Sequence, residues 1–204
     1  MQPGRLQRGR PVFLIGKMAL VCSVYPPSPF QEFNPTGGLE LFKCMKIHVG
    51  VVTISDRASR GLYDDLGGPA LKLAAAGYGW TLSGESLVPD EKRDIQRAIR
   101  ELIARGCHLI LTTGGTGVAL RDITPEAVRE IAIRELPGFG EVMRAESMKI
   151  THNAILSRCL AAVVDRSLIL CLPGKPKGAV ECLGFVVKAI PHCLEVLQEV
   201  PTSC

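Results

Sequence analysis

The chain has 204 residues, a formal net charge of +4 and 47% hydrophobic residues, which fits one α/β domain with a modest appendage. Aromatic residues make up only 5% of the chain, too few to provide a stacking surface for single-stranded nucleic acid. Most of the basic excess lies in residues 1–44, and the remainder is close to neutral. The composition therefore excludes a general nucleic-acid-binding surface.

Residues 1–44 begin with several arginines and then an apolar run at residues 12–22, an order that resembles a secretion signal. Lys17 interrupts that run, which is too short for a membrane span, and no small-residue cleavage site follows it. Met45 is followed at once by a strand pattern, as a natural start would be. We interpret residues 1–44 as a disordered extension or an over-long start assignment, residues 45–204 as the functional domain, and the protein as having no membrane partner.

From Met45 onward, apolar runs typical of buried strands alternate with segments typical of amphipathic helices. Strands are predicted at residues 47–54, 80–88, 107–112, 161–164 and 168–172. Helices are predicted at residues 64–76, 90–105, 139–150 and 153–160, with one more opening at Thr124 and a last one after Gly174 that breaks at Pro191. For the helix at Thr124 we expect the threonine to be the N-cap, with Pro125 and Glu126 in the first turn.

This alternation predicts a three-layer α/β/α sandwich, Rossmann-like, with a mostly parallel sheet and helices on both faces. In such sheets, ligands bind beyond the carboxyl ends of the strands. The loops expected there are also the most polar connections in the chain, rich in glycine or aspartate. They are Ser55–Arg57, Pro89–Glu91, Thr112–Asp122 and Pro173–Lys175.

The strongest chemical signal is the Gly-rich loop that follows the strand ending at Thr112, with Thr113, Gly114, Gly115, Thr116 and Gly117 in succession. Glycines allow several backbone N–H groups to converge on a phosphate, and the threonine hydroxyls add donors. A tight turn with positive φ would need only one glycine, so we favour an anion site. The loop is neither a P-loop nor a dinucleotide-binding fingerprint, because the spacing of its glycines differs from both.

Two aspartates flank this loop in the predicted fold. Asp122 is placed to hold Mg²⁺ against bound phosphates, although an Asx-turn before the helix explains it equally well. Asp90 has a simpler role as N-cap of the helix at residues 90–105, yet a capping aspartate can still turn one oxygen towards a metal.

The other two loops also carry polar groups of the right kind. In Ser55-Asp56-Arg57, the arginine could pair with a phosphate and the aspartate could accept hydrogen bonds from a heterocycle, or the two could close a solvated turn. Lys175 follows Pro173 and Gly174, where a strand turns into a helix; it could bind phosphate or extend into solvent.

Cysteines and histidines give no further site. The eight cysteines include no C-x-x-C pair and no zinc-ligand spacing, and several lie in apolar runs. We interpret them as buried residues with free thiols, which indicates a reducing compartment and a cytoplasmic location. The four histidines are scattered, and no pattern makes any of them a ligand or a base.

Five segments, taken in order and spacing, together resemble the molybdopterin adenylyltransferase family, the bacterial stand-alone Mog-type proteins that are similar also to the G domain of gephyrin. The resemblance runs from about Lys46 to Val200 and includes none of residues 1–44. Each segment alone is a weak signal, whereas their combination is specific. The segments are Thr53–Gly61, Val88–Glu91, Leu111–Gly117 with Arg121–Glu126, Pro137–Glu141 and Leu172–Lys177.

The resemblance implies a homotrimer that uses Mg²⁺ and ATP to adenylate the terminal phosphate of molybdopterin, releasing pyrophosphate, before a molybdenum-inserting enzyme takes over the product. It assigns the family's two key aspartates, which are catalytic and metal-binding, to Asp90 and Asp122. Lys175 departs from a common family form with an uncharged polar residue there, so its role stays open. The pterin and nucleotide loops fall on Ser55, Asp56, Arg57, Thr113, Gly114, Gly115, Thr116, Gly117, Pro173, Gly174 and Lys175.

Two other functions fit the same sequence pattern. The chain could bind molybdopterin or its precursor with little adenylation, or it could be a non-catalytic oligomeric assembly module. Retention of both Asp90 and Asp122 argues against pure assembly. The molybdenum-inserting enzyme that contains a similar domain is disfavoured, because the chain has no room for its additional domains.

Overall fold

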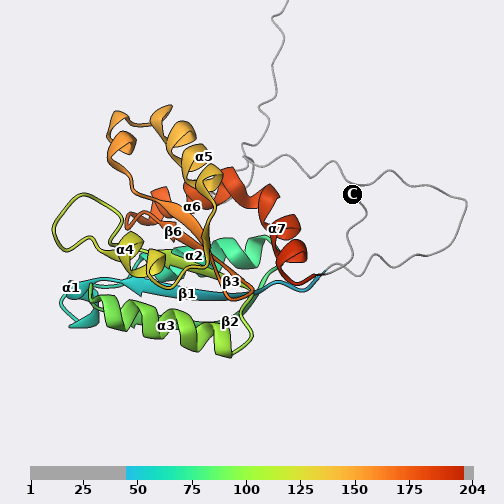
Figure 1. Cartoon of the computed structure of the whole chain (residues 1–204). Coiled ribbons are helices and arrows are strands. Elements are labelled where there is room, and N and C mark those ends of the chain that lie inside the picture. Colours follow the sequence, from blue (N-terminus) through green and yellow to red (C-terminus); the bar gives the residue numbers. More distant parts are fainter. Residues whose placement is uncertain (1–44, 200–204) are drawn as a thin grey trace, which may run out of the picture. The chain divides into compact units, whose positions relative to one another are not determined.

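The computed structural model describes residues 45–199, shown in colour in Figure 1. The interpretation of residues 1–44 lies outside the described residues. Within residues 45–199 the chain forms one sheet and helices on both of its faces. The strands are β1 His48–Ile54, β2 Thr81–Val88, β3 Leu109–Thr113, β4 Arg134–Glu135, β5 Leu160–Val164 and β6 Ser167–Leu172. The helices are α1 Asp56–Ser59, α2 Gly67–Gly77, α3 Lys92–Ala104, α4 Thr124–Arg129, α5 Pro137–Met148, α6 Pro176–Val186 and α7 Ile190–Leu197, with 3₁₀ turns at η1 His152–Leu156 and η2 Val187–Ala189.

The sheet has the strand order β2-β1-β3-β6-β5-β4. β2, β1, β3 and β6 run parallel. β5 runs antiparallel to both of its neighbours, β6 and the edge strand β4. The predicted mostly parallel α/β/α sandwich is therefore confirmed. The two-residue strand β4 was not predicted, because Arg134 and Glu135 are both exposed and show no apolar alternation.

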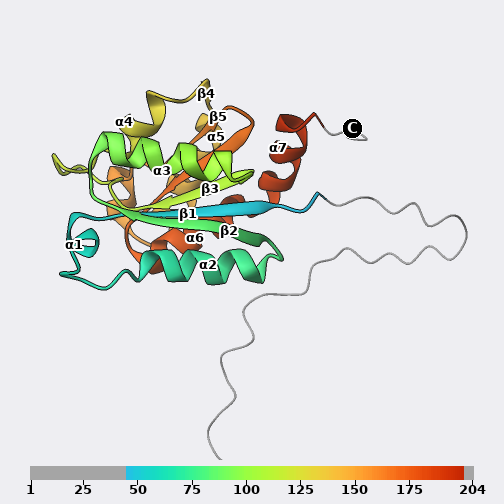
Figure 2. The ribbon, with the colours of Figure 1, turned by 90° about the horizontal axis from the view of Figure 1, so that it is seen from below.

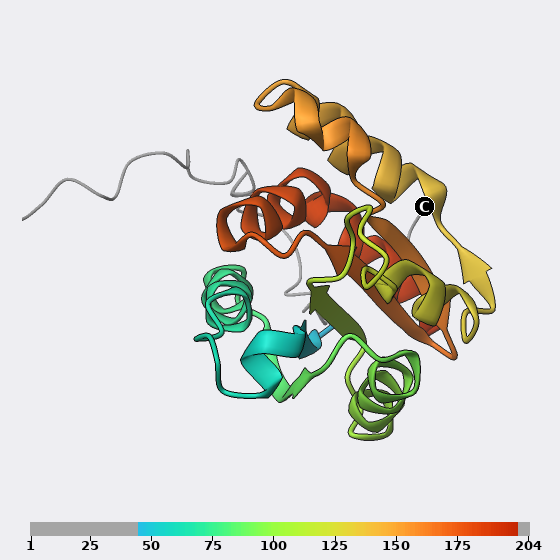
Figure 3. The same ribbon diagram turned by 90° about the vertical axis from the view of Figure 1, so that its left-hand side faces the viewer.

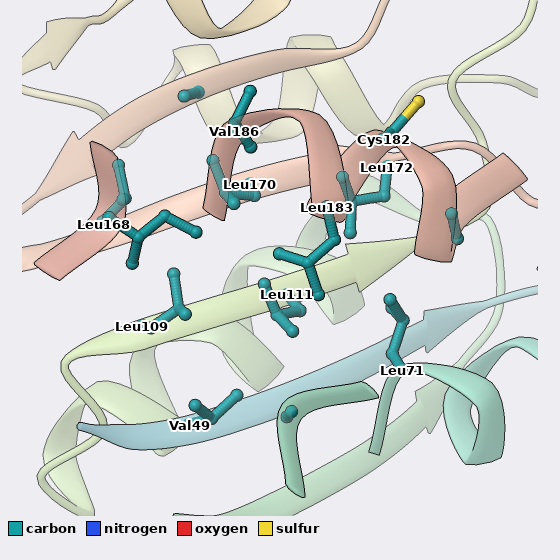
Figure 4. Close-up of a cluster of buried hydrophobic side chains, with 14 of the residues drawn as sticks. Val49, Leu71, Leu109, Leu111, Leu168, Leu170, Leu172, Cys182, Leu183 and Val186 are labelled. Carbon is teal, nitrogen blue, oxygen red and sulfur yellow. The ribbon is translucent and has the colours of Figure 1, made fainter. Parts of the chain in front are cut away.

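Both faces of the parallel strands are buried. Along β1, Val49 and Val51 face one side, whereas Val52 and Ile54 face the other. Helices α2, α5, α6 and α7 pack on the first face and α3 and α4 on the second. Figure 2 shows α2 and α3 on opposite sides of β1, and Figure 3 shows α5 and α6 on the side of the sheet opposite α3 and α4. Figure 4 shows the first layer, where Leu71 of α2 and Leu183 of α6 meet leucines of β3 and β6. Each such side chain contributes about 1.5–3 kcal/mol of burial free energy, which makes this core a rigid base for the loops.

Helix α3 follows its predicted pattern, since its apolar positions Ile95, Ile99 and Leu102 are fully buried. It begins at Lys92 with Glu91 as its cap residue, and no side chain caps its N-terminus. The prediction that Asp90 is the N-cap was therefore wrong. The carboxylate of Asp90 instead accepts a hydrogen bond from a different loop, which leaves it free of the helix.

Three other helix starts differ from the predictions. Helix α2 begins at Gly67, because the Asp65 carboxylate accepts the N–H of Gly68 at 2.9 Å and holds the preceding residues as a loop. At α4 the cap residue is Ile123, since the Thr124 hydroxyl donates instead to the carbonyl of Gly114 at 2.9 Å. The loop after β1 contains the short helix α1, which had been expected to be irregular.

Two further predicted helices differ in extent from the predictions. The predicted helix at residues 153–160 is only the 3₁₀ turn η1, because the chain is extended from Ser157 and enters β5 at Leu160. The last helix is interrupted at η2, and Pro191 lies in the first turn of α7, where its missing N–H costs nothing. Within residues 45–199, no helix is long and apolar enough to cross a membrane.

Candidate active site

The four predicted loops meet at the carboxyl edge of the sheet, the side that faces the viewer in Figure 3. The parallel strands bring them together because Ile54 pairs with Val88, Thr53 with Thr113, and Thr113 with Leu172. The residues that follow these strand ends therefore start close to one another. The edge carries the predicted binding residues Ser55, Asp56, Arg57, Asp90, Thr113, Gly114, Gly115, Thr116, Gly117, Asp122, Pro173, Gly174 and Lys175.

The Gly-rich loop needs glycine at two successive positions. Gly114 has φ +108°, and a Cβ there would lie 2.1 Å from the carbonyl oxygen of Ile54. Gly115 has φ +62°, and a Cβ there would lie 2.3 Å from the Thr124 hydroxyl. Because L-residues disfavour positive φ and no space remains, both positions exclude side chains. The loop therefore presents bare backbone at the strand ends, as a phosphate site requires.

Both predicted aspartates lie against this loop. A Cβ on Gly115 would be 3.1 Å from Oδ1 of Asp90, and one on Gly117 would be 2.7 Å from Oδ2 of Asp122. Asp122 also accepts the N–H of Ala119 at 2.8 Å, so its carboxylate closes the loop on itself. The structure thus brings Asp90 and Asp122 to two neighbouring glycines of one loop.

Asp90 forms a reciprocal pair with Asp56. The Asp56 N–H donates to Oδ2 of Asp90 at 2.8 Å, and the Asp90 N–H donates to Oδ1 of Asp56 at 3.2 Å. Burial raises the pKa of Asp90 above its ordinary value, and the charges of Asp56 and Asp122 act in the same direction. The negative charge of Asp122 is therefore close enough to Asp90 to contribute to its raised pKa.

Arg121 balances part of this negative charge. Its guanidinium donates to both oxygens of Asp56, at 3.0 and 2.9 Å, and to Glu91 at 2.9 Å. Burial alone would raise the pKa of Asp56, but the hydrogen bonds from Arg121 and from the Asp90 N–H outweigh it and hold the pKa below its ordinary value. Sequence reasoning gave Arg121 no role of its own, although it lies in the Arg121–Glu126 segment that carries part of the family resemblance.

The acids at this edge suit a magnesium ion that also binds phosphates. Within the described residues, no cluster of three or more His, Cys, Asp or Glu side chains could hold a metal by itself. Asp90 and Asp122 offer two carboxylates, and a raised pKa at Asp90 is typical of acids whose negative charge lacks a partner. Mg²⁺ characteristically takes one or two carboxylates and completes its shell with water and substrate phosphates. The residues present therefore fit Mg²⁺ together with a phosphate ligand.

The threonine hydroxyls of the loop are already used within the protein. Thr113 donates to the carbonyl of Pro173 at 2.8 Å, and Thr116 donates to the carbonyl of Leu172 at 3.4 Å. Both side chains are buried. They bind the Gly-rich loop to the end of β6, and a Cβ on Gly174 would lie only 3.3 Å from Cα of Gly114. A direct part for these hydroxyls in ligand binding stays a prediction.

The first loop places its three residues in different surroundings. Ser55 caps α1 by accepting the N–H of Ala58 at 3.2 Å. The Arg57 guanidinium lies 5.3 Å from the centre of the Tyr63 ring, which is a cation–π contact. Of the three residues, Asp56 alone contacts Asp90. Arg57 would have to leave the Tyr63 ring to reach a phosphate.

A pocket of about 410 Å³ opens beside the Gly-rich loop. Thr116, Gly117 and Pro173–Lys175 line one side of it. The opposite wall comes from α5, η1 and α6, and sequence reasoning missed it because these residues belong to helices with no distinguishing motif. Its polar members are Ser147, Thr151, Asn153, Ser157, Glu181 and the thiol of Cys182. Asp90 and Asp122 are not among the lining residues, although Gly117 borders the pocket and also lies against Asp122.

The expectation of buried cysteines with free thiols is confirmed for four cysteines in the described part of the chain. Cys107, Cys159, Cys171 and Cys182 are buried and form no disulfide. The rings of His48 and His108 pack against each other edge to face, 5.4 Å apart, near the start of β1 and just before β3. They are therefore far from the carboxyl edge and take no part in the site.

A mostly parallel sheet covered by helices on both faces places the domain in the doubly wound α/β class, whose members bind ligands beyond the carboxyl ends of the strands. Residues 50–192 match the family described as "Probable molybdopterin binding domain". The chain belongs to this family of molybdopterin-binding domains.

Relatives and solved structures carry related names. The chain is 46% identical over 156 residues to the molybdopterin adenylyltransferase of Helicobacter pylori strain J99, a match that covers 74% of this chain and 88% of that protein. It is 42% identical over 168 residues to the protein of the same name from Escherichia coli K12, covering 74% and 86%. The molybdopterin biosynthesis enzyme MoaB from Thermus thermophilus superposes with a TM-score of 0.71 at 44% identity, covering 76% of this chain and 98% of that one.

Proposed function

We propose that this chain is a molybdopterin adenylyltransferase, which transfers AMP from ATP to the phosphate of molybdopterin and releases pyrophosphate during molybdenum cofactor biosynthesis. Relatives that carry this name are 42–46% identical over most of the chain. The structural observation that supports the proposal best is the position of Asp90 and Asp122 against Gly115 and Gly117. Two acids beside a bare-backbone loop can hold a triphosphate and its counter-ion, which is what adenylyl transfer from ATP requires.

In the proposed reaction, a phosphate oxygen of molybdopterin attacks the α-phosphorus of ATP and pyrophosphate leaves on the opposite side. Such a displacement depends on alignment and on neutralisation of charge more than on a nucleophilic side chain. The backbone of Gly114–Gly117 would bind phosphate oxygens, and Asp90 and Asp122 would hold Mg²⁺. When bound, Mg²⁺ supplies positive charge that offsets the developing negative charge of the phosphates.

The pocket beside the loop would receive the pterin. Its volume of about 410 Å³ is within the range typical of small-ligand sites. Ser147, Asn153 and Ser157 would supply donors and acceptors for the edges of a heterocycle, and Lys175, which lines the same pocket, would contact the phosphate of molybdopterin. Because Gly117 lines this pocket and also lies against Asp122, the two substrates would meet at the Gly-rich loop.

Assembly as a homotrimer, a cytoplasmic location and transfer of the product to a molybdenum-inserting enzyme complete the proposal. They rest on the resemblance in sequence, and the free buried thiols agree with a reducing compartment. Light scattering of the purified protein would measure the subunit number directly; three subunits are expected, and a monomer would contradict this part of the proposal.

The deciding experiment compares wild type with Asp122→Asn. Purified protein is incubated with molybdopterin, ATP and Mg²⁺, and adenylated pterin and pyrophosphate are measured. The amide of the variant can still accept the N–H of Ala119, so the loop keeps its bond while the charge is lost. We expect kcat/KM to fall about 100-fold or more, as for removal of a fixed group that stabilises transition-state charge.

Asp165→Asn is the matched control. Asp165 lies in the turn between β5 and β6, at the opposite edge of the sheet, with φ +52°, a conformation that asparagine tolerates. It should match wild type. Asp122→Asn with full activity would show that the metal site is assigned wrongly, and wild type that binds molybdopterin without making product would favour a binding protein of the same fold.

A further inference from the structure

Arg158 contacts the backbone at both ends of the segment from Gly117 to Asp122. It lies between η1 and β5, and its side chain is 32% exposed. Its Nε donates to the carbonyl of Gly117 at 2.6 Å, and its Nη2 donates to the carbonyl of Asp122. Its backbone N–H donates to the carbonyl of Thr116 at 3.0 Å. One residue thus fixes the chain where it leaves the glycines and again where it presents the second aspartate.

The same guanidinium anchors the helix that follows the loop. Its Nη1 forms an ion pair with Oε1 of Glu126, in the first turn of α4. The other oxygen of Glu126 is buried and accepts no hydrogen bond within residues 45–199. The positive charge of Arg158 therefore offsets the cost of burying this carboxylate. The planar fork of arginine serves three acceptors at once, which the single ammonium of lysine cannot do in this geometry.

The loop has few other ties between Gly117 and Asp122. Asp122 and Ala119 are joined to each other by two local hydrogen bonds, which do not reach outside the loop. Val118 and Leu120 are 66% and 99% exposed. Arg121 adds ion pairs to Asp56 and Glu91, but these join exposed side chains and not the loop backbone. Contacts from Arg158 therefore hold the backbone of Gly117 and Asp122 in place from outside the loop.

We propose that Arg158 is a positioning residue for adenylyl transfer, which keeps the carboxylate of Asp122 against Gly117. It acts through the backbone of the loop. This inference rests on the proposed function for its kinetic effect, whereas its effect on the shape of the loop follows from the contacts alone.

The test compares Arg158→Gln, Arg158→Lys and wild type by hydrogen exchange and by kinetics. In Arg158→Gln, amides of residues 116–124 should exchange faster while those of β1, β3 and β6 keep their protection. The catalytic efficiency should fall about 10- to 100-fold, as for partners that orient metal ligands. In Arg158→Lys, the exchange protection of residues 116–124 and the catalytic efficiency should both be partly restored, because the ammonium keeps the positive charge and can still donate to the loop.

Arg100→Gln is the control, since Arg100 is exposed on α3 and its side chain makes no hydrogen bond or ion pair within the described part of the chain. It should match wild type. Unchanged exchange at residues 116–124 in Arg158→Gln would overturn the proposal. So would loss of protection throughout the sheet in both Arg158 variants, which would make Arg158 a residue of global stability. If wild type itself makes no adenylated pterin, the proposed function fails while the exchange data still decide whether Arg158 shapes the loop.

Discussion

Asp56 and Asp90 each accept a hydrogen bond from the backbone N–H of the other, an arrangement that orients both carboxylates before any ligand is present. Arg121 then neutralises Asp56 through two hydrogen bonds, whereas the oxygens of Asp90 receive none from a cation in the described part of the chain. The two acids consequently differ in pKa, one below and one above the ordinary value. Of the two carboxylates, that of Asp90 is therefore the one that remains available to a metal ion.

The raised pKa of Asp90 predicts how stability depends on pH in the absence of metal. The folded protein keeps a proton on Asp90 at pH values where the unfolded chain has lost it, so the stabilising contribution is present below the unfolded value of 3.8 and is lost as pH rises through the folded pKa. Asp90→Asn cannot titrate. As pH rises from 3.8 through the folded pKa of Asp90, wild type loses this contribution and the variant does not. We therefore expect the free energy of unfolding of the variant to increase relative to that of wild type over this pH range.

Urea denaturation of both proteins at a series of pH values, with a chelator present, measures this difference. A difference that does not change with pH would show that Asp90 has an ordinary pKa in the folded protein. A difference that changes in the opposite direction would show that a cation pairs with Asp90.

The residues of the site could be predicted only where they follow a strand. Asp90, Asp122 and Gly114 come directly after or close to strand ends, and the parallel topology brings such positions together. Arg158 could not be predicted in this way, because its partners Gly117 and Asp122 are about 40 residues earlier and nothing in the local pattern marks it. The family resemblance is confirmed, whereas the separate roles of the site residues stay predictions.

At the scale of elements, the Gly-rich loop is a connection whose shape depends on missing side chains. Gly114→Ala would combine a positive φ with a Cβ 2.1 Å from the backbone of Ile54. We expect it to lower the free energy of unfolding by about 1–3 kcal/mol and to weaken ATP binding, because the strand end and the loop must both shift.

Gly138→Ala is the matched comparison, since Gly138 lies in the first turn of α5 and a Cβ there meets nothing within 4 Å. It should leave stability unchanged or slightly raised. Chemical denaturation and calorimetric titration with ATP measure both variants. Equal behaviour of Gly114→Ala and Gly138→Ala would mean that the loop is free to relax and that its conformation is not needed.

The elements themselves were predictable to the extent that burial imposes a pattern. β1, β3 and β6 are buried on both faces and read as continuous apolar runs, and α3 shows a clean helical period. The helix starts were less predictable, because polar side chains bond distant partners in place of local capping. Thr124 bonds the Gly-rich loop, and Asp90 bonds the loop after β1. Capping rules consider only neighbours in sequence, so they missed both.

For the whole molecule, the folded unit is predicted to work without its first residues. The buried clusters lie within residues 47–194, and the family match begins at residue 50. A chain starting at Met45 should keep the activity of the full chain and a free energy of unfolding within about 0.5 kcal/mol of it. Assay and denaturation of the two lengths side by side measure this. Lost activity in the shorter chain would mean that residues 1–44 contribute to the enzyme.

The central claim is that one edge of the sheet binds a metal-bound triphosphate between the Gly-rich loop and two aspartates. A crystal structure of the protein with Mg²⁺ and a non-hydrolysable ATP analogue tests it most directly. We expect phosphate oxygens on the backbone of Gly114–Gly117 and a cation bound by Asp90 and Asp122. A triphosphate bound elsewhere, or a cation at this edge that neither aspartate contacts, would contradict it.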